Sequence, residues 1–345
     1  MNDAPRLVVI IPAYNAERFI ERSVKSVLSQ SFTDLTLIVA DDGSTDRTGE
    51  LLQEMAARDS RLLPLTLSNG GPAQARNRAL ELVPEGAEYI MFMDADDELL
   101  PDAAEYALGG SHGADLVIFG FSIINPDGSR RDYCEPESLL DREALGGPLS
   151  KLYKANLLNQ VWGKLFKASL IRGGALSFPD YRWGEDRLFI YDCLERASLT
   201  AVLPECKYRY MMNPGESLIN RYYDKKFPVC LMADERMEAL CLLFGVTEEA
   251  DFRYMFSKGV FSCLTTLFSP SCPLTAGEKR AFIREVVSNE RVLRRCDRVF
   301  GGFAANFLCA VVRSGSVPLN YQVFRLVALT GRVNPRLFQT LKHRK

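Results

Sequence analysis

The sequence has few histidines, no paired cysteine motif and no long apolar run. Only His112 and His343 occur in 345 residues, which argues against a histidine-based catalytic triad, a histidine-rich zinc site or a haem site. The nine cysteines form no Cys-x-x-Cys pair, and their odd number and loose spacing predict reduced thiols in a reducing compartment. We therefore expect a cytoplasmic protein.

Signals for export, membrane spanning and nucleic-acid binding are also lacking. The run Leu7–Ile11 is followed by Pro12 and is too short for a signal-peptide core. The longest uncharged stretch near the C-terminus, 299–312, has fourteen residues, whereas a membrane span needs about 20. A formal net charge of −2 argues against a nucleic-acid partner. The sequence has neither a Walker-type phosphate loop nor the Gly-x-Gly-x-x-Gly turn of dinucleotide dehydrogenases.

Short apolar runs alternate with helical periodicity over the first 120 residues. The apolar runs span 7–11, 35–40, 62–67, 89–93 and 116–121. Runs of this length predict strands that are buried on both faces, so the pattern is typical of an α/β domain with a mostly parallel central sheet. Ligands of such sheets bind beyond the carboxyl ends of the strands, and we expect the functional site there.

The pattern loosens after about residue 122 and becomes helical beyond residue 220. Helices are expected at 184–197, 227–244, 249–268, 277–289, 299–313 and 321–332. We therefore predict a domain at 1–215, with a nucleotide half at about 1–100 and an acceptor half at about 101–215. A helical C-terminal region at 216–345 follows it.

Three carboxylates, Asp94, Asp96 and Asp97, follow the run at 89–93. Carboxylates this close repel one another unless water or a cation neutralises them. In an extended chain Asp94 and Asp96 point the same way and offer oxygen ligands to Mg²⁺ or Mn²⁺. The alternative is a cap for a helix that starts near Pro101. The position directly after an apolar run favours the metal site.

The segment Asp41-Asp42-Gly43-Ser44 has two interpretations. It can cap the following helix, with Gly43 in a turn. Alternatively, one of its carboxylates accepts a hydrogen bond from a nucleobase N–H while the loop lies behind the ribose.

Four segments in order resemble the nucleotide-sugar domain of the family-two inverting glycosyltransferases with a GT-A fold. They are VVIIPAYNAERFIERSVKSVLSQSF, LIVADDGSTDRT, NGGPAQARNRAL and YIMFMDADDELLPD, and the resemblance covers about residues 5–215. It implies nucleoside contacts at Pro12, Tyr14, Asp41, Asp42 and Arg76, a ribose contact at Asp94, a metal ligand at Asp96 and a sugar contact at Asp97.

Two later segments extend the resemblance. NQVWGKLF, which contains Trp162 and Lys164, resembles the family's segment beside the acceptor cleft. WGEDRLF resembles the Glu-Asp motif that supplies the catalytic base, with Asp186 as the base and Glu185 as the adjacent alternative. An acidic first helical turn is the structural alternative for this pair. Trp162 and Trp183 either stack on sugar rings or pack in the core.

The resemblance implies metal-dependent transfer of a hexosyl or N-acetylhexosaminyl group from a UDP- or dTDP-sugar. The acceptor would be a hydroxyl of a glycan or polyprenyl-linked glycan in bacterial surface-polysaccharide synthesis. One alternative, a sugar-1-phosphate nucleotidyltransferase, requires a Gly-rich basic loop that Tyr14-Asn15-Ala16-Glu17 does not supply. The other, a non-catalytic nucleotide- or glycan-binding scaffold, gives the acidic motifs no chemical role.

The C-terminal tail is basic, with eight Lys and Arg and no Asp or Glu from Arg298 onward. One interpretation is a helical subdomain that packs on the catalytic domain and has solvated charges. The other is peripheral contact of residues 298–345 with the anionic inner leaflet of the membrane.

Overall fold

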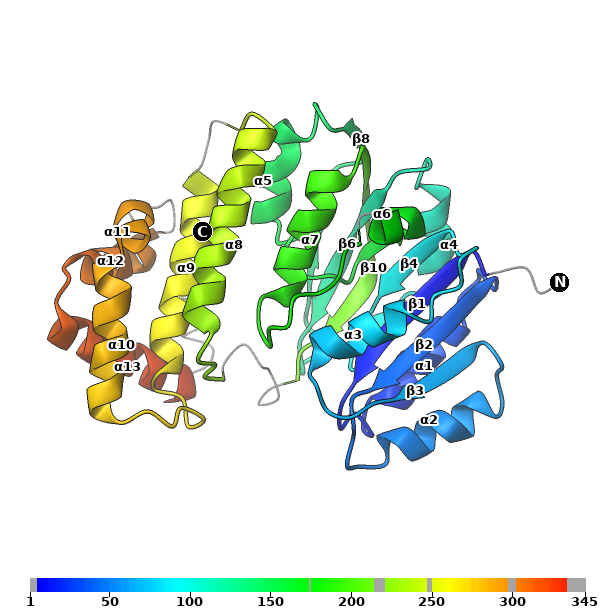
Figure 1. Ribbon diagram of the computed structural model, residues 1–345, viewed down its shortest axis with the longest axis horizontal. Coiled ribbons are helices and arrows are strands. Elements are labelled where there is room, and N and C mark those ends of the chain that lie inside the picture. The colour runs from blue at the N-terminus through cyan, green and yellow to red at the C-terminus, as the bar shows by residue number, and fades with distance from the viewer. Residues whose placement is uncertain (1–4, 174, 214–220, 247–249, 297–301, 334–345) are drawn as a thin grey trace. The chain divides into compact units, whose positions relative to one another are not determined.

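The computed structural model describes residues 5–173, 175–213, 221–246, 250–296 and 302–333 (Figure 1). The chain divides into two compact units, Met1–Pro214 and Gly215–Lys345. The sequence-based boundary lay between residues 215 and 216. Each unit is described by itself.

The first unit contains one large sheet and seven helices among its described residues. The strands are β1 (Leu7–Ala13), β2 (Leu35–Asp41), β3 (Leu62–Thr66), β4 (Tyr89–Phe92), β5 (Glu98–Leu99), β6 (Leu116–Ile124), β7 (Arg130–Tyr133), β8 (Ser138–Asp141), β9 (Lys164–Lys167) and β10 (Leu199–Met211). The helices are α1 (Ile20–Leu28), α2 (Thr48–Ala56), α3 (Pro72–Leu80), α4 (Ala103–Gly109), α5 (Gly146–Lys154), α6 (Ala168–Gly173) and α7 (Glu185–Arg196).

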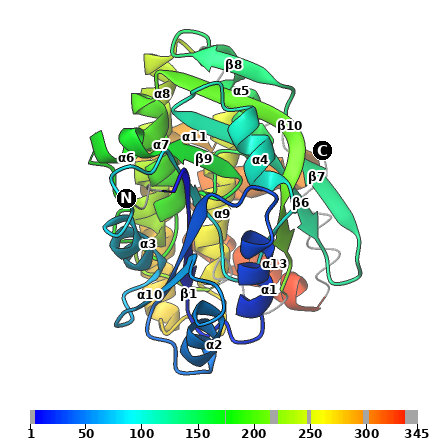
Figure 2. The ribbon, with the colours of Figure 1, turned by 90° about the vertical axis from the view of Figure 1, so that its right-hand side faces the viewer.

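The strand order is β3-β2-β1-β4-β9-β6-β10-β5, with β7 paired to β6 and β8 paired to β10. The pairings among β1 to β4 are parallel, and β10 runs parallel to β6 along most of its length (Figure 2). The predicted α/β class with a mainly parallel central sheet is therefore confirmed. The sequence pattern did not predict β9, which lies antiparallel between β4 and β6.

The core of the first unit follows from the apolar runs. Each residue of Leu7–Ile11 is at most 1% exposed, as expected for a strand covered on both faces. Ile20, Val24 and Val27 form the buried stripe of α1. Helix α3 contacts β1 and β2 and crosses in front of β1 in Figure 1.

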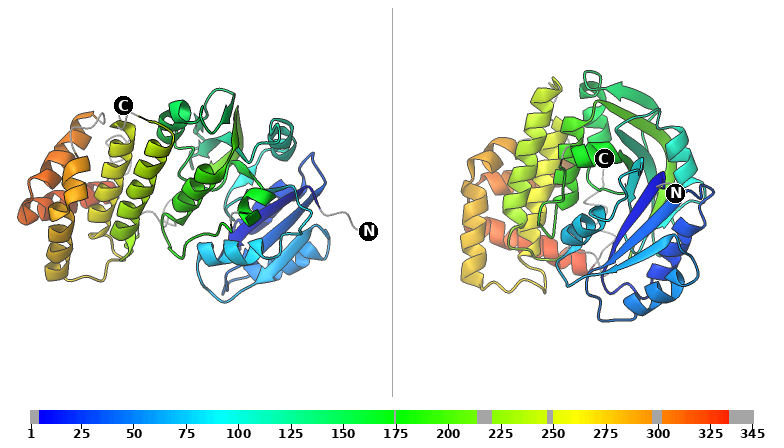
Figure 3. Two further views of the ribbon diagram at one scale, coloured as in Figure 1. Left: turned by 45° about the horizontal axis from the view of Figure 1, so that its top comes forward. Right: turned by 45° about the vertical axis from the view of Figure 1, so that its right-hand side comes forward.

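The second unit is helical in all its described regular structure. Its helices are α8 (Lys226–Leu243), α9 (Ala250–Thr266), α10 (Ala276–Ser288), α11 (Glu290–Arg295), α12 (Gly302–Arg313) and α13 (Val317–Val333). Helices α8 and α9 run side by side (Figure 3), and α13 contacts both α9 and α10. Phe252, Ile283 and Phe324 contribute to its buried core. Among the described residues, no helix is both long enough and apolar enough to span a membrane.

Candidate active site

The loops that follow β1, β2 and β3 meet at one edge of the sheet. Ala13 at the end of β1 lies opposite Asp41 at the end of β2. Beyond that pair, the Asn15 N–H donates to Ser44 Oγ at 2.9 Å, and the Thr45 N–H donates to Asn15 Oδ1 at 2.8 Å. These contacts order two of the sequence-predicted segments against each other.

Asp41 and Asp42 are both buried at this edge, and each carboxylate orders a loop. Asp41 Oδ1 accepts a hydrogen bond from the Ser44 N–H at 2.9 Å. The two carboxylate oxygens of Asp42 accept from the Gly70 and Gly71 N–H groups at 2.8 and 2.7 Å. The structure thus assigns Asp41 a role in ordering the loop after β2 and Asp42 a role in ordering the loop after β3. Their predicted contact with a base or ribose remains a prediction.

Gly43 is required where the loops after β2 and β3 approach each other closely. Its φ of +73° lies in the left-handed region, and a Cβ there would meet the Asn69 backbone nitrogen at 2.9 Å. Tyr14 and Pro12 lie at the same edge of the sheet, and the Tyr14 side chain is 52% exposed. An exposed ring beside ordered backbone provides a surface on which a flat ligand can stack.

The segment 94–97 is a turn, and this corrects one expectation. Because residues 95 and 96 form the turn, Asp94 and Asp96 are not successive same-face positions of an extended chain. The Asp97 N–H donates to the Asp94 carbonyl at 3.2 Å. The capping alternative is not realised at the expected position either, since α4 starts at Ala103 after Asp102.

Each of the three carboxylates therefore has different partners. Asp94 Oδ1 accepts from Arg76 at 2.9 Å, and Asp96 Oδ2 accepts from Asn213 Nδ2 at 3.0 Å. Asp97 is fully buried; the Tyr208 hydroxyl donates to one of its oxygens at 2.6 Å, and the Met211 N–H donates to the other at 2.8 Å. Burial, and then the charges of Asp96 and Asp94, raise the pKa of Asp97.

Arg76 is the centre of a cluster with three carboxylates. It lies on α3, and its Nη1 donates to Asp186 at 2.7 Å and to Glu185 at 3.2 Å, while its Nη2 binds Asp94. Gly184, at a left-handed φ of +83°, precedes α7 and places Glu185 and Asp186 in its first turn. The structure thus brings together residues that lie 18, 109 and 110 positions from Arg76 in the sequence.

The excess of carboxylates in this cluster changes the protonation of its members. Burial, and then the neighbouring Asp186, raise the pKa of Glu185 to about 8 despite Arg76. Loss of water around the carboxyl raises the pKa of Asp94 to about 6, against the opposing charge of Arg76. For Arg76, burial acts against the charged form, but Asp186, Asp94 and Glu185 outweigh it and raise the pKa. A cluster of this kind can hold and release a proton near neutral pH.

The carboxylates at 94–97 suit a metal ion that takes most of its ligands from the bound substrate. Among the described residues, no group of three or more His, Cys, Asp or Glu side chains is placed to hold a metal ion. Asp94 pairs with Arg76 and Asp97 is enclosed, so Asp96 is the carboxylate of this segment that can take a ligand. Mg²⁺ commonly binds through one or two carboxylates together with substrate phosphates, and Asp96 fits that pattern.

The residues predicted to contact sugar or acceptor lie mostly inside the fold. Trp162 stacks on Tyr208, with ring centroids 4.5 Å apart, and is buried. Lys164 is fully buried, its Nζ donates to the Gln160 carbonyl at 2.7 Å, and burial lowers its pKa to about 7. Trp183 is only half-buried, next to the catalytic pair predicted from the sequence, and the Arg187 guanidinium lies 5.7 Å from its ring.

Two residues of β10 and its C-terminal extension were missed by the sequence reasoning. Tyr208 binds Asp97, and its oxygen accepts from the Asp94 N–H at 3.2 Å. Asn213 binds Asp96. Tyr208 and Tyr210 are two positions apart, which is a possible signal for a strand with both hydroxyl-bearing rings on one face. No sequence motif links that strand to the aspartates.

Comparison with known proteins places the chain in a family. A sequence profile described as "Glycosyl transferase family 2" matches residues 8–169. The teichuronic acid biosynthesis glycosyltransferase TuaG of Bacillus subtilis, a protein named as putative, is 30% identical over 215 residues, which are 61% of this chain and 81% of that protein. The chain belongs to glycosyl transferase family 2.

Other glycosyltransferases are also similar to this chain. The uncharacterized glycosyltransferase EpsJ of Bacillus subtilis is 29% identical over 61% of this chain and 62% of its own length. Glycosyltransferase GlyA of Streptococcus pneumoniae is 27% identical over 69% of this chain. This chain covers only 34% of GlyA.

Solved structures extend the likeness of fold over nearly the whole chain. The TarS 1–349 fragment of S. aureus, crystallised with UDP-GlcNAc, has a TM-score of 0.65 at 20% identity and covers 94% of this chain and 92% of the fragment. A mannosyltransferase from Pyrobaculum calidifontis, crystallised with GDP-Man and Mn²⁺, has a TM-score of 0.53 at 15% identity and covers 96% and 88%. The GT-A type of fold is therefore shared.

Proposed function

We propose that this family 2 protein is an inverting glycosyltransferase that uses a UDP- or dTDP-sugar. In this proposal it transfers the sugar to a hydroxyl of a glycan or lipid-linked glycan during surface-polysaccharide synthesis. The observation that carries the proposal is that Asp94 and Asp186 are bound to opposite nitrogens of one buried guanidinium. A donor-side carboxylate and a candidate base are thereby held at the same edge of the sheet.

The reaction requires a base on the side of the sugar opposite the leaving diphosphate. We assign this role to Asp186, which removes the proton of the acceptor hydroxyl as its oxygen attacks the anomeric carbon. The bond between that carbon and the diphosphate oxygen breaks, and the diphosphate leaves with the bonding electrons. Arg76 and the Val161 N–H, at 2.7 and 3.4 Å, orient the Asp186 carboxylate.

Two observations favour Asp186 over Glu185 as the base. The Asp186 side chain is 18% exposed, against 9% for Glu185, so it is the more accessible to an acceptor. With a pKa of about 8, Glu185 is mostly protonated at neutral pH and is unable to accept a second proton. Glu185 therefore serves as a proton-holding neighbour that limits the negative charge around Arg76.

The donor contacts divide into direct and supporting ones. Exposed Tyr14, with Pro12, would bind the nucleoside face, and buried Asp41 and Asp42 would hold the loops around it. Half-buried Trp183 is the residue proposed to contact sugar or acceptor directly. The side chains of Asp97, Trp162 and Lys164 are enclosed, so we assign them supporting roles in this part of the site.

A divalent cation, Mn²⁺ or Mg²⁺, is part of the proposal, with Asp96 as its protein ligand. When bound, it would offset the charge that develops on the diphosphate. The Asn213 amide orients the Asp96 carboxylate, while the Tyr208 hydroxyl and the Met211 N–H fix Asp97 and hence the turn.

Donor binding and hydrolysis test the proposal together. Thermal shift with UDP-, dTDP- and GDP-sugars, with and without Mn²⁺, should identify a donor, because a ligand that binds only the native state raises its melting temperature. The same donor should then be hydrolysed slowly to nucleoside diphosphate and sugar. Binding without hydrolysis or transfer would indicate a scaffold, and pyrophosphate release from a nucleoside triphosphate with a sugar phosphate would indicate a nucleotidyltransferase.

Cytoplasmic location and peripheral contact with an anionic membrane complete the proposal. All nine cysteines are free thiols, which agrees with a reducing compartment.

The proposed membrane contact rests on exposed aromatic side chains and on basic charge. On α12, Phe303 and Phe307 are 89% and 49% exposed, and the sequence from 298 onward has Lys and Arg but no Asp or Glu. Because Val311, Val312 and Phe324 are buried, deleting the tail would open the core. Phe303→Ser with Phe307→Ser should instead reduce sedimentation with phosphatidylglycerol vesicles and leave the melting temperature unchanged. Undiminished sedimentation would exclude this surface.

A further inference from the structure

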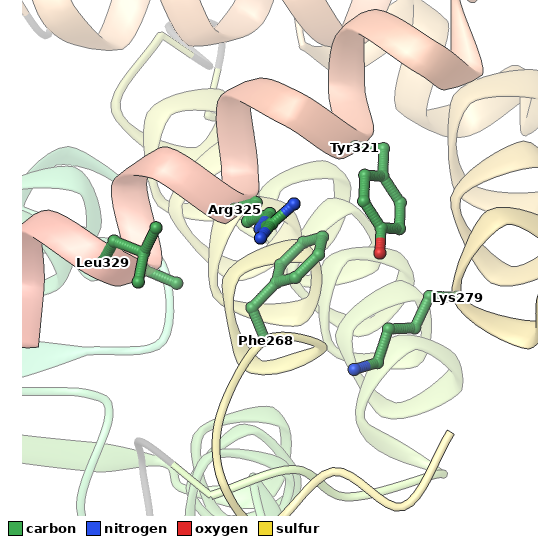
Figure 4. Close-up of a pocket in the computed structure, with 6 residues that line it drawn as sticks. Phe268, Lys279, Tyr321, Arg325 and Leu329 are labelled. Atoms are coloured by element: carbon green, nitrogen blue, oxygen red, sulfur yellow. The ribbon is translucent and has the colours of Figure 1, made fainter. Parts of the chain in front are cut away.

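A pocket in the second unit combines aromatic walls with basic side chains. It has a volume of about 390 Å³ and lies between α10, α13 and the turn after α9 (Figure 4). Its lining residues are Phe268, Lys279, Tyr321, Arg325, Ala328 and Leu329. Volumes of about 300–1,000 Å³ are typical of small-molecule sites, so this pocket suits one or two sugar-sized groups.

The aromatic rings are held in a fixed arrangement at this pocket. Phe268 and Tyr321 meet edge to face, with ring centroids 5.0 Å apart and an interplanar angle of 86°. The Lys279 ammonium lies 5.7 Å from the Phe268 centroid, and the Arg280 guanidinium lies 5.0 Å from the Tyr321 centroid. Rings fixed in this way present flat apolar surfaces beside positive charge.

The two basic residues that line the pocket, Lys279 and Arg325, have no carboxylate partner within the part of the chain that the structure describes. The same holds for Arg280, which lies beside the Tyr321 ring. Glu278, the acidic neighbour on α10, is engaged elsewhere: its carboxylate accepts from the Thr275 N–H and hydroxyl at 2.7 and 2.8 Å and caps the helix. Helix α13, which supplies Arg325, contains no Asp or Glu. The pocket is therefore positively charged as folded.

We propose that this pocket binds a sugar unit that carries an anionic group, either phosphate or carboxylate. The C–H face of a sugar ring packs on an aromatic side chain, and the anion is bound by Lys279 and Arg325 through charge-assisted hydrogen bonds. This inference rests on the proposed transferase function, because it makes the pocket a subsite for an anionic glycan acceptor. A flat lipid surface fits less well, since Phe303 and Phe307 do not line the pocket.

The experiment uses the full chain with ¹³C-labelled alanine and leucine methyl groups. The methyl signals of Ala328 and Leu329, which line the pocket, report binding at this place. Titrants are glucose 6-phosphate, glucuronic acid, glucose and inorganic phosphate, with phosphatidylglycerol vesicles tested by sedimentation. We expect both anionic sugars to bind at least about tenfold more tightly than glucose, and glucose 6-phosphate more tightly than inorganic phosphate.

Charge variants sharpen the test. Lys279→Gln and Arg325→Gln should each weaken glucose 6-phosphate binding by about tenfold or more, since a charge-assisted hydrogen bond is lost. Arg284→Gln is the matched control. Arg284 is an exposed arginine of α10, the helix that carries Lys279, and it does not line the pocket. Donor hydrolysis should be the same in all three variants and the wild type.

Several results would overturn the inference. Equal binding of inorganic phosphate and glucose 6-phosphate would reduce the pocket to an ion site. Equal effects of Arg284→Gln and Arg325→Gln would indicate general electrostatics, and loss of vesicle binding with sugar binding unaffected would indicate a lipid site. Each of these leaves donor hydrolysis intact. If the wild type instead binds the sugar phosphate but hydrolyses no donor, the transferase proposal fails and the pocket assignment stands.

Discussion

Each unit contains a cluster of arginine and carboxyl side chains around a buried arginine, and the two clusters differ in charge balance. In the first unit Arg76 forms ion pairs with Asp94, Glu185 and Asp186. In the second unit the partners are Arg291, Arg294 and Arg295 with Asp234, Glu235 and Glu238. One cluster has an excess of two carboxylates, and the other has equal numbers of both charges.

The two glutamates that face arginine, Glu185 in the first cluster and Glu238 in the second, have pKa values shifted in opposite directions. Glu185 has its pKa raised to about 8 by burial and by Asp186. For Glu238 burial also acts upward, but Arg291, Arg295 and Arg294 outweigh it and lower the pKa. Asp234 lies deeper, and there burial raises the pKa even against Arg295 and Arg291. The second cluster, which has equal numbers of both charges, links α8 to α11. The first cluster, which has more carboxyl groups than arginines, keeps a proton on Glu185 next to the proposed catalytic base.

Asp186→Asn is expected to have the largest effect. Removing the base should lower kcat by about 10²- to 10⁴-fold and leave donor affinity unchanged, because the donor is bound by other residues. Steady-state kinetics and donor titration measure the two quantities.

The matched control for that variant is Asp234→Asn in the second cluster. It should lower the melting temperature while kcat remains near that of the wild type. Near wild-type turnover by Asp186→Asn would remove Asp186 as the base.

Arg76→Met tests how much Arg76 stabilises the carboxyl groups of the first cluster, through the free energy of unfolding of the first unit. Without the Arg76 guanidinium, the carboxyl groups of Asp94, Glu185 and Asp186 lose the cation that pairs with all three, and the free energy of unfolding should fall by about 3–5 kcal/mol. Trp162 and Trp183, the only tryptophans, lie in the first unit, so their fluorescence during urea unfolding reports that unit alone.

The corresponding variant in the second cluster is Arg295→Met. Because Arg291 still binds Asp234 at 2.6 Å, the loss there should be smaller, at about 1–2 kcal/mol, measured as the circular-dichroism change that tryptophan fluorescence does not follow. Equal losses in the two units would contradict the distinction between the clusters.

The sequence could predict features that depend on local pattern, and it missed those that depend on distant chain segments. The run Leu7–Ile11 predicted a buried strand because every residue of it is apolar. The four-residue strand β9 has lysine at both ends, and Lys164 is buried only because the Gln160 and Trp162 carbonyls accept from it. No local pattern predicts such partners.

The candidate site shows the same division. The motifs identified Arg76, Asp94 and Asp186 separately, but their common contact depends on a meeting of α3, α7 and the end of β4. The extended geometry expected for Asp94 and Asp96 was wrong because the strand ends at Phe92 and the chain turns. The pairing of Asp97 with Tyr208 required β10, a strand that the sequence pattern did not predict.

Glu185→Gln tests whether the Glu185 carboxyl is protonated in the folded state at neutral pH. A raised folded-state pKa gives stability that is complete below the ordinary value of about 4.3 and is lost as pH rises through about 8. The wild-type unfolding free energy of the first unit should therefore fall with pH in this window, by at most about 1.4 kcal/mol per pH unit from this group. Glu185→Gln should flatten that fall, measured by urea unfolding at pH 5, 6, 7 and 8. An unchanged slope would place the proton elsewhere.

Glu238→Gln should show the opposite pH dependence with the smallest effect. Because the folded-state pKa of Glu238 is lowered, its contribution is present above about pH 4.3 and disappears as pH falls through the folded-state value. The variant should be less stable than the wild type by about 1 kcal/mol at pH 7, and the difference should shrink as pH falls below about 4.3 toward the lowered folded-state pKa. Urea unfolding followed by circular dichroism at pH 3.5, 5 and 7 measures it. If the stability difference between Glu238→Gln and the wild type grows toward low pH, the pKa of Glu238 is raised like that of Glu185. The contrast between the two glutamates would then no longer hold.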